Sequence, residues 1–223
     1  MPRTQYGKRD SLRLETGPGA FAIFSFPPRD SPSATVPGSR LITIPSGSTW
    51  KTGLHWHEEY DESVRVVQGR AAITISGVTR FYGPEDGTLT FPKYTVHEFG
   101  RADNSGDAFD EGDTVIEEWV DPEDGFKAVF FYNVIGAILE SNNKPGALDL
   151  IQIGTTVAYV DEFPVFVPGP FFLKYAVTHA LLTTVSSIGW LMGYKPWVKE
   201  YTPEHIWEIA RTRGGRHRGV KVE

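Results

Sequence analysis

The chain has 223 residues, of which 40% are hydrophobic and 13% aromatic, and it carries a formal net charge of -6. This length and composition suit one substantial core, or a core with an appendage. The acidic balance argues against a nucleic-acid partner, and the absence of cysteine excludes disulfides and thiolate metal ligands. Residues 1–15 are polar and charged and do not resemble a secretory signal, so we expect a cytoplasmic protein.

Residues 21–134 alternate short apolar segments with turns rich in Gly, Pro, Ser and Asp. Residues 1–20 are predicted to form an N-terminal arm. The spacing over 21–134 predicts about eight to ten short strands, which is typical of an all-β sandwich or barrel. The last two of these strands are predicted over 113–120 and 127–134.

After residue 134 the pattern becomes helical. Apolar segments at 134–140, 147–159 and 171–194 are separated by breaks rich in Asn, Pro and Gly. Thr202, followed by Pro203, has the form of a helix start. We therefore predict a C-terminal helical appendage over 135–223.

Three histidines and one carboxylate have the spacing of a metal site. His55 and His57 are two residues apart on a predicted strand, so their side chains point to the same face. Glu62 follows one turn later, and His97 belongs to a later strand. Iron, manganese, nickel and zinc all accept such ligands. A site without cysteine favours a catalytic metal over a structural zinc.

The same residues carry a family resemblance. The segment from His55 to Gly69 resembles the first cupin motif, and the segment from Pro92 to His97 resembles the second. The resemblance implies a mainly β protein with a double-stranded β-helix, or jelly-roll, barrel. It also implies a set of four ligands for one divalent metal, with iron preferred: His55, His57, Glu62 and His97.

The chain departs from the cupin pattern at loop and turn positions. Tyr94 stands where the second motif has a glycine, and Arg101 replaces the usual asparagine. The whole chain, with its helical part, also resembles small single-domain cupins of fungi, some of which accompany secondary-metabolite clusters. This resemblance implies a metal-dependent enzyme, preferably an oxygenase, that acts on a small and fairly apolar substrate. A metal-assisted isomerase, cyclase or decarboxylase and a non-catalytic binding protein are the alternatives.

Further residues are candidates for the substrate pocket. Glu117 and Glu118 interrupt an apolar strand, so one of them must share a face with apolar neighbours. A carboxylate on a dry inner face has a raised pKa and suits general acid–base chemistry, whereas a salt-bridged carboxylate is the structural alternative. Phe91 and Tyr132 are candidates for substrate contact, with core packing as the alternative.

Residues 175–194 carry no formal charge and are long enough to cross a membrane, but they contain many hydroxyl side chains. Helical spacing places an apolar set on one face: Val177, Leu181, Val185, Ile188 and Met192. We expect this face to pack on the barrel or across a homodimer interface. The alternatives are a lid over the pocket and a membrane-surface contact through 171–223, with Trp190 and Trp197 as anchors.

Overall fold

A computed structural model of the protein describes residues 3–27, 36, 38–102 and 112–214. The chain divides into two compact units: Asp10–Glu123, called the β unit here, and Met1–Arg9 with Asp124–Glu223, called the helical unit. These boundaries differ from the predicted ones at residues 20 and 134. The first strand begins within the predicted arm, and the first helix begins one residue before the predicted last strand and includes all of it.

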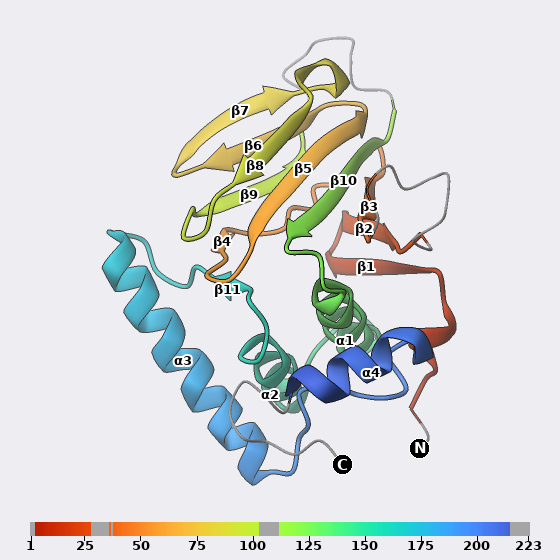
Figure 1. Ribbon diagram of the computed structural model, residues 1–223, viewed down its shortest axis with the longest axis vertical. Helices are drawn as coiled ribbons and strands as arrows, with labels where there is room; N and C mark the ends of the chain where they lie inside the picture. The colour runs from red at the N-terminus through yellow and green to blue at the C-terminus, as the bar shows by residue number, and fades with distance from the viewer. Residues whose placement is uncertain (1–2, 28–35, 37, 103–111, 215–223) are drawn as a thin grey trace. The chain divides into compact units, whose positions relative to one another are not determined.

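The β unit consists of two antiparallel sheets (Figure 1). One sheet has the strand order β1-β2-β3-β10-β5-β8, and the other contains β4-β9-β6-β7. The predicted jelly-roll architecture is confirmed, and the described residues form two sheets without a closed barrel. The strands are β1 (Ser11–Gly17), β2 (Ala20–Ser25), β3 (Arg40–Ile44), β4 (His55–Trp56), β5 (Asp61–Gln68), β6 (Ala71–Ile75), β7 (Val78–Tyr82), β8 (Thr88–Phe91), β9 (His97–Arg101) and β10 (Thr114–Asp121).

The core of the β unit follows from side-chain alternation along these strands. Val64 and Val66 of β5 are almost fully buried, and their neighbours across the ladder are Glu118 and Ile116 of β10. Directly opposite residues of an antiparallel pair share a face, so these four side chains line one inner surface. Burying each such aliphatic side chain stabilises the fold by about 1.5–3 kcal/mol.

The helical unit contains α1 (Phe126–Glu140), α2 (Ala147–Val157), α3 (Phe171–Leu191) and α4 (Glu204–Gly214), with a two-residue strand, β11 (Phe163–Pro164). The predicted strand over 127–134 was wrong, because these residues form the first half of α1. Their aromatic and β-branched side chains favour a strand, but a short apolar run does not distinguish a strand from a buried helix. The carboxylate of Asp124 accepts the Phe126 N–H at the helix start, at 3.0 Å.

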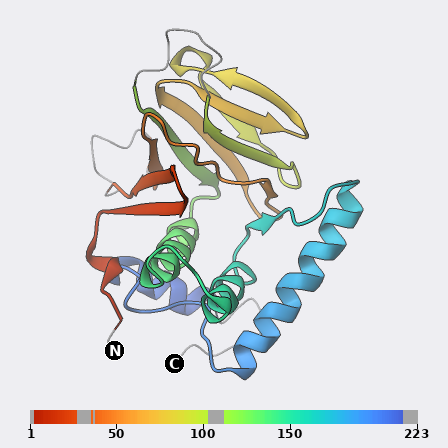
Figure 2. The same cartoon turned by 180° about the vertical axis from the view of Figure 1, so that it is seen from behind.

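The apolar face predicted for α3 is not the face that is buried within the chain, and its predicted contact across a homodimer interface stays a prediction. Thr178, Leu182, Ser186 and Gly189 are buried, whereas Leu181, Ile188 and Met192 of the predicted face are exposed. Figure 1 and Figure 2 both show α3 running beside α2. The small buried residues allow this close approach, since a Cβ added to Gly189 would lie 2.0 Å from the Thr155 hydroxyl oxygen.

Among the described helices, none is both long enough and apolar enough to cross a membrane. Of the two tryptophans predicted as anchors, Trp190 is exposed, but Trp197 is buried against the ring of Phe126. Arg211 to Lys221 contains five lysines and arginines, and three of them belong to residues 215–223, which lie outside the described residues.

Asn133 holds α1 to the segment that precedes α4. Its amide nitrogen donates to the carbonyl oxygen of Val129 at 2.8 Å and to the hydroxyl oxygen of Thr202 at 2.9 Å. Its amide oxygen accepts the Val198 N–H at 2.7 Å. The side chain is fully buried, so all three bonds form away from water.

We predict that Asn133→Leu lowers the free energy of unfolding by about 3 kcal/mol, because a buried donor without a partner costs about 1–3 kcal/mol. Urea denaturation followed by circular dichroism measures the change. Ser141→Ala removes one bond to a main-chain carbonyl at a partly exposed site and is the control. Equal stability of Asn133→Leu and the wild type would contradict the structural role.

Candidate metal centre

Four side chains from both sheets of the β unit meet at one point. His55 lies in β4 and His97 begins β9, and these two residues are paired across the ladder. His57 follows β4 directly, and Glu62 lies in β5 of the other sheet. The predicted ligand set is therefore brought together by strand pairing and by the packing of one sheet on the other.

The geometry of the cluster suits a metal ion. One nitrogen or oxygen atom from each residue lies within 4.8 Å of those of the other three, and all four residues are buried. Glu62 is the centre: its Oε2 lies 2.8 Å from the Nε2 of His57 and 4.0 Å from that of His55. Its Oε1 lies 3.4 Å from the Nε2 of His97. Ligands about 2.1 Å from a shared metal lie at most about 4.2 Å apart, so the cluster needs only a small contraction.

Main-chain carbonyls orient two of the three imidazoles. The Nδ1 of His55 lies 2.8 Å from the carbonyl oxygen of Gly53, and the Nδ1 of His97 lies 2.8 Å from that of Thr95. A carbonyl oxygen only accepts, so each Nδ1 carries the proton and donates it. The lone pair of each ring is then on Nε2, which faces Glu62. This arrangement is typical of histidines that bind metals.

Burial and charge together favour a cation at this place. Burial lowers the pKa of His97 below its usual value of 6.5, although a hydrogen bond with Glu62 opposes the shift. His97 is therefore neutral at pH 7 and able to bind a metal. The carboxylate of Glu62 is completely buried. A buried carboxylate needs positive charge beside it, and a divalent ion provides that charge.

Phe91 and Tyr94 shape the surroundings of the cluster. The Phe91 ring stacks on the His97 ring, with centroids 4.2 Å apart and planes 24° apart. Phe91 is opposite Glu62 in the β5–β8 ladder. Tyr94 keeps the left-handed backbone (φ 65°) that suits the glycine of the cupin motif, and its N–H donates to the carbonyl oxygen of His57 at 2.6 Å. The departure at this position therefore leaves the site intact.

Strand register places Glu118, and not Glu117, on the inner face. Glu118 is opposite Val64, which is two residues from Glu62 and so shares its face. Glu117 is opposite Arg65 on the other face. There it lies 2.5 Å from the Arg65 Nη2 and accepts a 2.7 Å bond from the Ser39 hydroxyl.

Arg40 is a neighbour of Glu118 that sequence reasoning missed. It is opposite Glu118 in the β3–β10 ladder, 1% exposed, and its Nε lies 3.6 Å from the Glu118 Oε1. The alternation of Arg40 with Ile42 and Ile44 would have revealed an inward arginine. Of the two alternatives that the sequence offered, the salt-bridged carboxylate therefore describes Glu118 better than a carboxylate among apolar groups alone.

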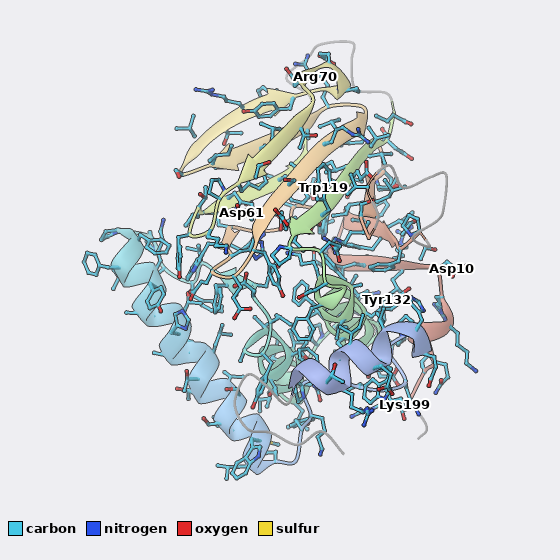
Figure 3. The ribbon with its side chains drawn as sticks, viewed as in Figure 1. Asp10, Asp61, Arg70, Trp119, Tyr132 and Lys199 are labelled. Atoms are coloured by element: carbon cyan, nitrogen blue, oxygen red, sulfur yellow. The ribbon has the colours of Figure 1, made fainter. Side chains whose placement is uncertain are left out.

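Tyr132 lies on α1 in the helical unit and not at the end of a strand, as Figure 3 shows. Its hydroxyl donates to the carbonyl oxygen of Arg9 at 2.8 Å, which links α1 to the N-terminal segment of the same unit. Its predicted contact with substrate stays a prediction.

No protein-family model matches the chain. Among curated proteins, it is 28% identical over 208 residues to the "Probable oxidoreductase patJ" of Penicillium expansum, covering 90% of this chain and 61% of that protein. It is 26% identical over 163 residues to the "Epoxidase atD" of Aspergillus terreus, covering 72% of this chain and 49% of that protein. The chain thus spans about three-fifths or less of the length of these relatives.

Solved structures show low similarity to the chain. A predicted oxalate decarboxylase from Thermotoga maritima is 13% identical and has a TM-score of 0.37, covering 53% of this chain and 97% of that one. KdgF from Halomonas sp. is 18% identical with a TM-score of 0.32, covering 53% and 94%. The two sheets and the converging motif residues confirm the resemblance to cupins.

We predict that the metal-free protein becomes less stable as the pH falls below 6.5. In the unfolded chain His97 takes up a proton near pH 6.5, whereas the folded protein does so only at a lower pH. The stability that neutral His97 provides is therefore complete above pH 6.5 and is lost as the pH falls towards its folded pKa. Urea denaturation at pH 7.5 and at pH 5.5, with chelator present, measures the change.

The control for this prediction is His97→Gln, which cannot take up a proton. Its loss of stability between the two pH values should be smaller than that of the wild type. Equal losses in both proteins would contradict the role of His97.

Proposed function

We propose that the chain is a metal-dependent cupin enzyme, an iron oxygenase that acts on a small, fairly apolar organic substrate of secondary metabolism. The observation that carries the proposal is the buried convergence of the three Nε2 atoms and the Glu62 carboxylate. Three histidines and one carboxylate leave coordination positions open for substrate or for dioxygen. The Phe91 ring, which stacks on the His97 ring, gives the cluster an apolar neighbour and supports an apolar substrate.

The fungal relatives support oxidation over the alternatives. Two of them are named as an oxidoreductase and an epoxidase. When bound, iron would supply one-electron chemistry with dioxygen, whereas zinc, nickel or manganese would supply a Lewis acid for an isomerase, a cyclase or a decarboxylase. We also propose a cytoplasmic location, which a chain without cysteine fits.

The residues of the chain have separate roles in this proposal. His55, His57, Glu62 and His97 hold the metal, and Gly53 and Thr95 keep two of the rings in the binding orientation through their carbonyl oxygens. Phe91 covers the face of the His97 ring and excludes water from it. Glu118 accepts a proton from the substrate, since it lies on the same inner face as Glu62 and has Arg40 beside it.

Metal analysis of the purified protein tests the ligand set. We predict near-stoichiometric metal in the wild type, and binding at least about 100-fold weaker in His57→Ala, since a direct ligand matters more than the supporting groups around it. The β unit should stay folded, as near-ultraviolet circular dichroism would show. The control is His205→Ala, a histidine on the exposed surface of α4.

The identity of the metal separates the functions. Iron that supports substrate-dependent oxygen uptake would support the oxygenase. Activity with zinc, nickel or manganese, but not with iron, would instead support the isomerase, cyclase or decarboxylase. Metal retained at full stoichiometry by His57→Ala would contradict the ligand set itself.

A matched pair of substitutions tests Glu118. Glu118→Gln and Glu117→Gln make the same chemical change at adjacent positions on opposite faces of β10. We predict that Glu118→Gln keeps its metal and lowers kcat by about 100- to 10,000-fold, which is the usual contribution of general acid–base catalysis. kcat is measured on a substrate found by screening the wild type under air.

Glu117→Gln should keep kcat and lose stability, because it weakens the buried contact with Arg65 and Ser39. If both variants keep the wild-type kcat, Glu118 does not carry a proton in the reaction.

A further inference from the structure

Helix α3 exposes most of its large apolar side chains, and most of the side chains that it buries are small. The inward positions are Thr178, Leu182, Ser186 and Gly189. Near the two ends of the helix, Phe172 is 74% exposed and Leu191 is 76% exposed. A helix whose outer face contacts only water normally has polar or charged side chains on that face and apolar side chains on the inner face. The outer face of α3 is therefore built to contact another apolar surface.

Five exposed residues lie along the middle of the outer face of α3. Leu173, Ala180, Thr184, Ser187 and Leu191 follow one another at helical spacings of 7, 4, 3 and 4 residues, and all five are exposed. The large side chains stand at the two ends of this line, and the small ones stand in the middle. We call these five residues the outer stripe.

The hydroxyl groups of the outer stripe are already satisfied within the helix. Thr184 donates to the carbonyl oxygen of Ala180 at 2.8 Å, and Ser187 donates to that of Thr183 at 2.7 Å. These bonds leave the methyl and methylene groups of both residues facing outwards. The stripe can therefore be buried without leaving an unpaired donor, which would cost about 1–3 kcal/mol.

We propose that the outer stripe pairs with the same stripe of a second copy of this chain. The two helices run antiparallel about a two-fold axis that crosses the outer face midway between Ala180 and Thr184. In this register Leu173 of one copy faces Leu191 of the other, and Ala180 faces Thr184. Small residues at the crossing point allow the two backbones to approach closely. Phe172 of one copy then lies beside Trp190 of the other and fills the space where the helices separate.

Charge and area favour a second copy as the occupant. From Tyr175 to Leu191 the chain has no Asp, Glu, Lys or Arg, so two identical faces meet without repulsion. Phe172 and Trp190, 74% and 63% exposed, offer on the order of 500 Å² over two copies, at about 150–250 Å² for a whole aromatic side chain. The aliphatic side chains along about 31 Å of helix add the remainder of the roughly 1,000 Å² that a specific interface requires.

A membrane surface fits the helix less well. A helix that lies in a membrane interface has a strongly charged polar face, often rich in lysine and arginine. From Tyr175 to Leu191 α3 has no charged side chain on any face. The hydroxyl groups of its buried face are used within the chain: the Thr178 hydroxyl, for example, donates to the carbonyl oxygen of Pro164 at 2.8 Å.

Sedimentation equilibrium of the full-length protein tests the pairing. We expect a dimer at micromolar concentration, and a dissociation constant at least about 100-fold higher for Ala180→Glu, which brings carboxylates into an apolar contact. The control is Ala147→Glu, the same change at the exposed start of α2. A monomeric wild type, or equal effects of the two substitutions, would overturn the proposal. So would a monomer that sediments with vesicles of phosphatidylcholine and phosphatidylserine.

Cysteine cross-linking tests the antiparallel register, because the natural chain has no cysteine. Leu173→Cys and Leu191→Cys combined in one chain should give a covalent dimer on mild oxidation, whereas each single variant should not. Within one helix the two positions are about 27 Å apart, so they cannot join to each other. Covalent dimers of the single variants would indicate a parallel pair and overturn the register.

Discussion

The buried carboxylate of Glu62 is the constraint on which the β unit depends. Its side chain is completely excluded from water and lies among three imidazoles that come from the other sheet or from the turn after β4. A charge in this position is unfavourable unless hydrogen bonds and a cation compensate it. In the metal-free protein the hydrogen bond between His57 and Glu62 provides part of that compensation, and a divalent metal held by both side chains would replace it. The core and the candidate site therefore depend on each other, because the Glu62 carboxylate that favours a bound metal also connects the two sheets.

Strand pairing explains why the four ligand side chains are accurately positioned although they come from distant parts of the chain. His55 and His97 are partners in one ladder, and their rings are held by carbonyl oxygens two residues before each of them. The repeated spacing gives both rings the same tautomer from purely local geometry. Glu62 is fixed independently by its ladder with β10. Local turns thus set the direction of each ligand, and the sheets set the distances between them.

The parts of the protein that could be predicted are those for which local pattern and long-range packing agree. The His55, His57, Glu62 and His97 cluster follows from alternation and motif spacing, and α2 and α4 follow from their breakers and caps. The first half of α1 was not predictable, because its aromatic and β-branched residues have strand propensity and only tertiary packing selects the helix. The choice between Glu117 and Glu118 required the register of β10 against β5, which a single strand cannot reveal.

In helix α3 the amphipathic pattern of the sequence does not predict which face is buried. The usual inference assumes that water lies on one side of a helix and the core of the same chain on the other. In α3 the contact with α2 is made through small residues at close approach, as the 2.5 Å distance from a Cβ added at Gly154 to the Val185 Cγ1 indicates. Because α2 and α3 approach each other closely, the inner side of α3 has little room for large side chains. The large side chains of α3 therefore lie on its outer side. In the proposed pairing both sides of α3 are contact surfaces, and burial within one chain reveals only one of them.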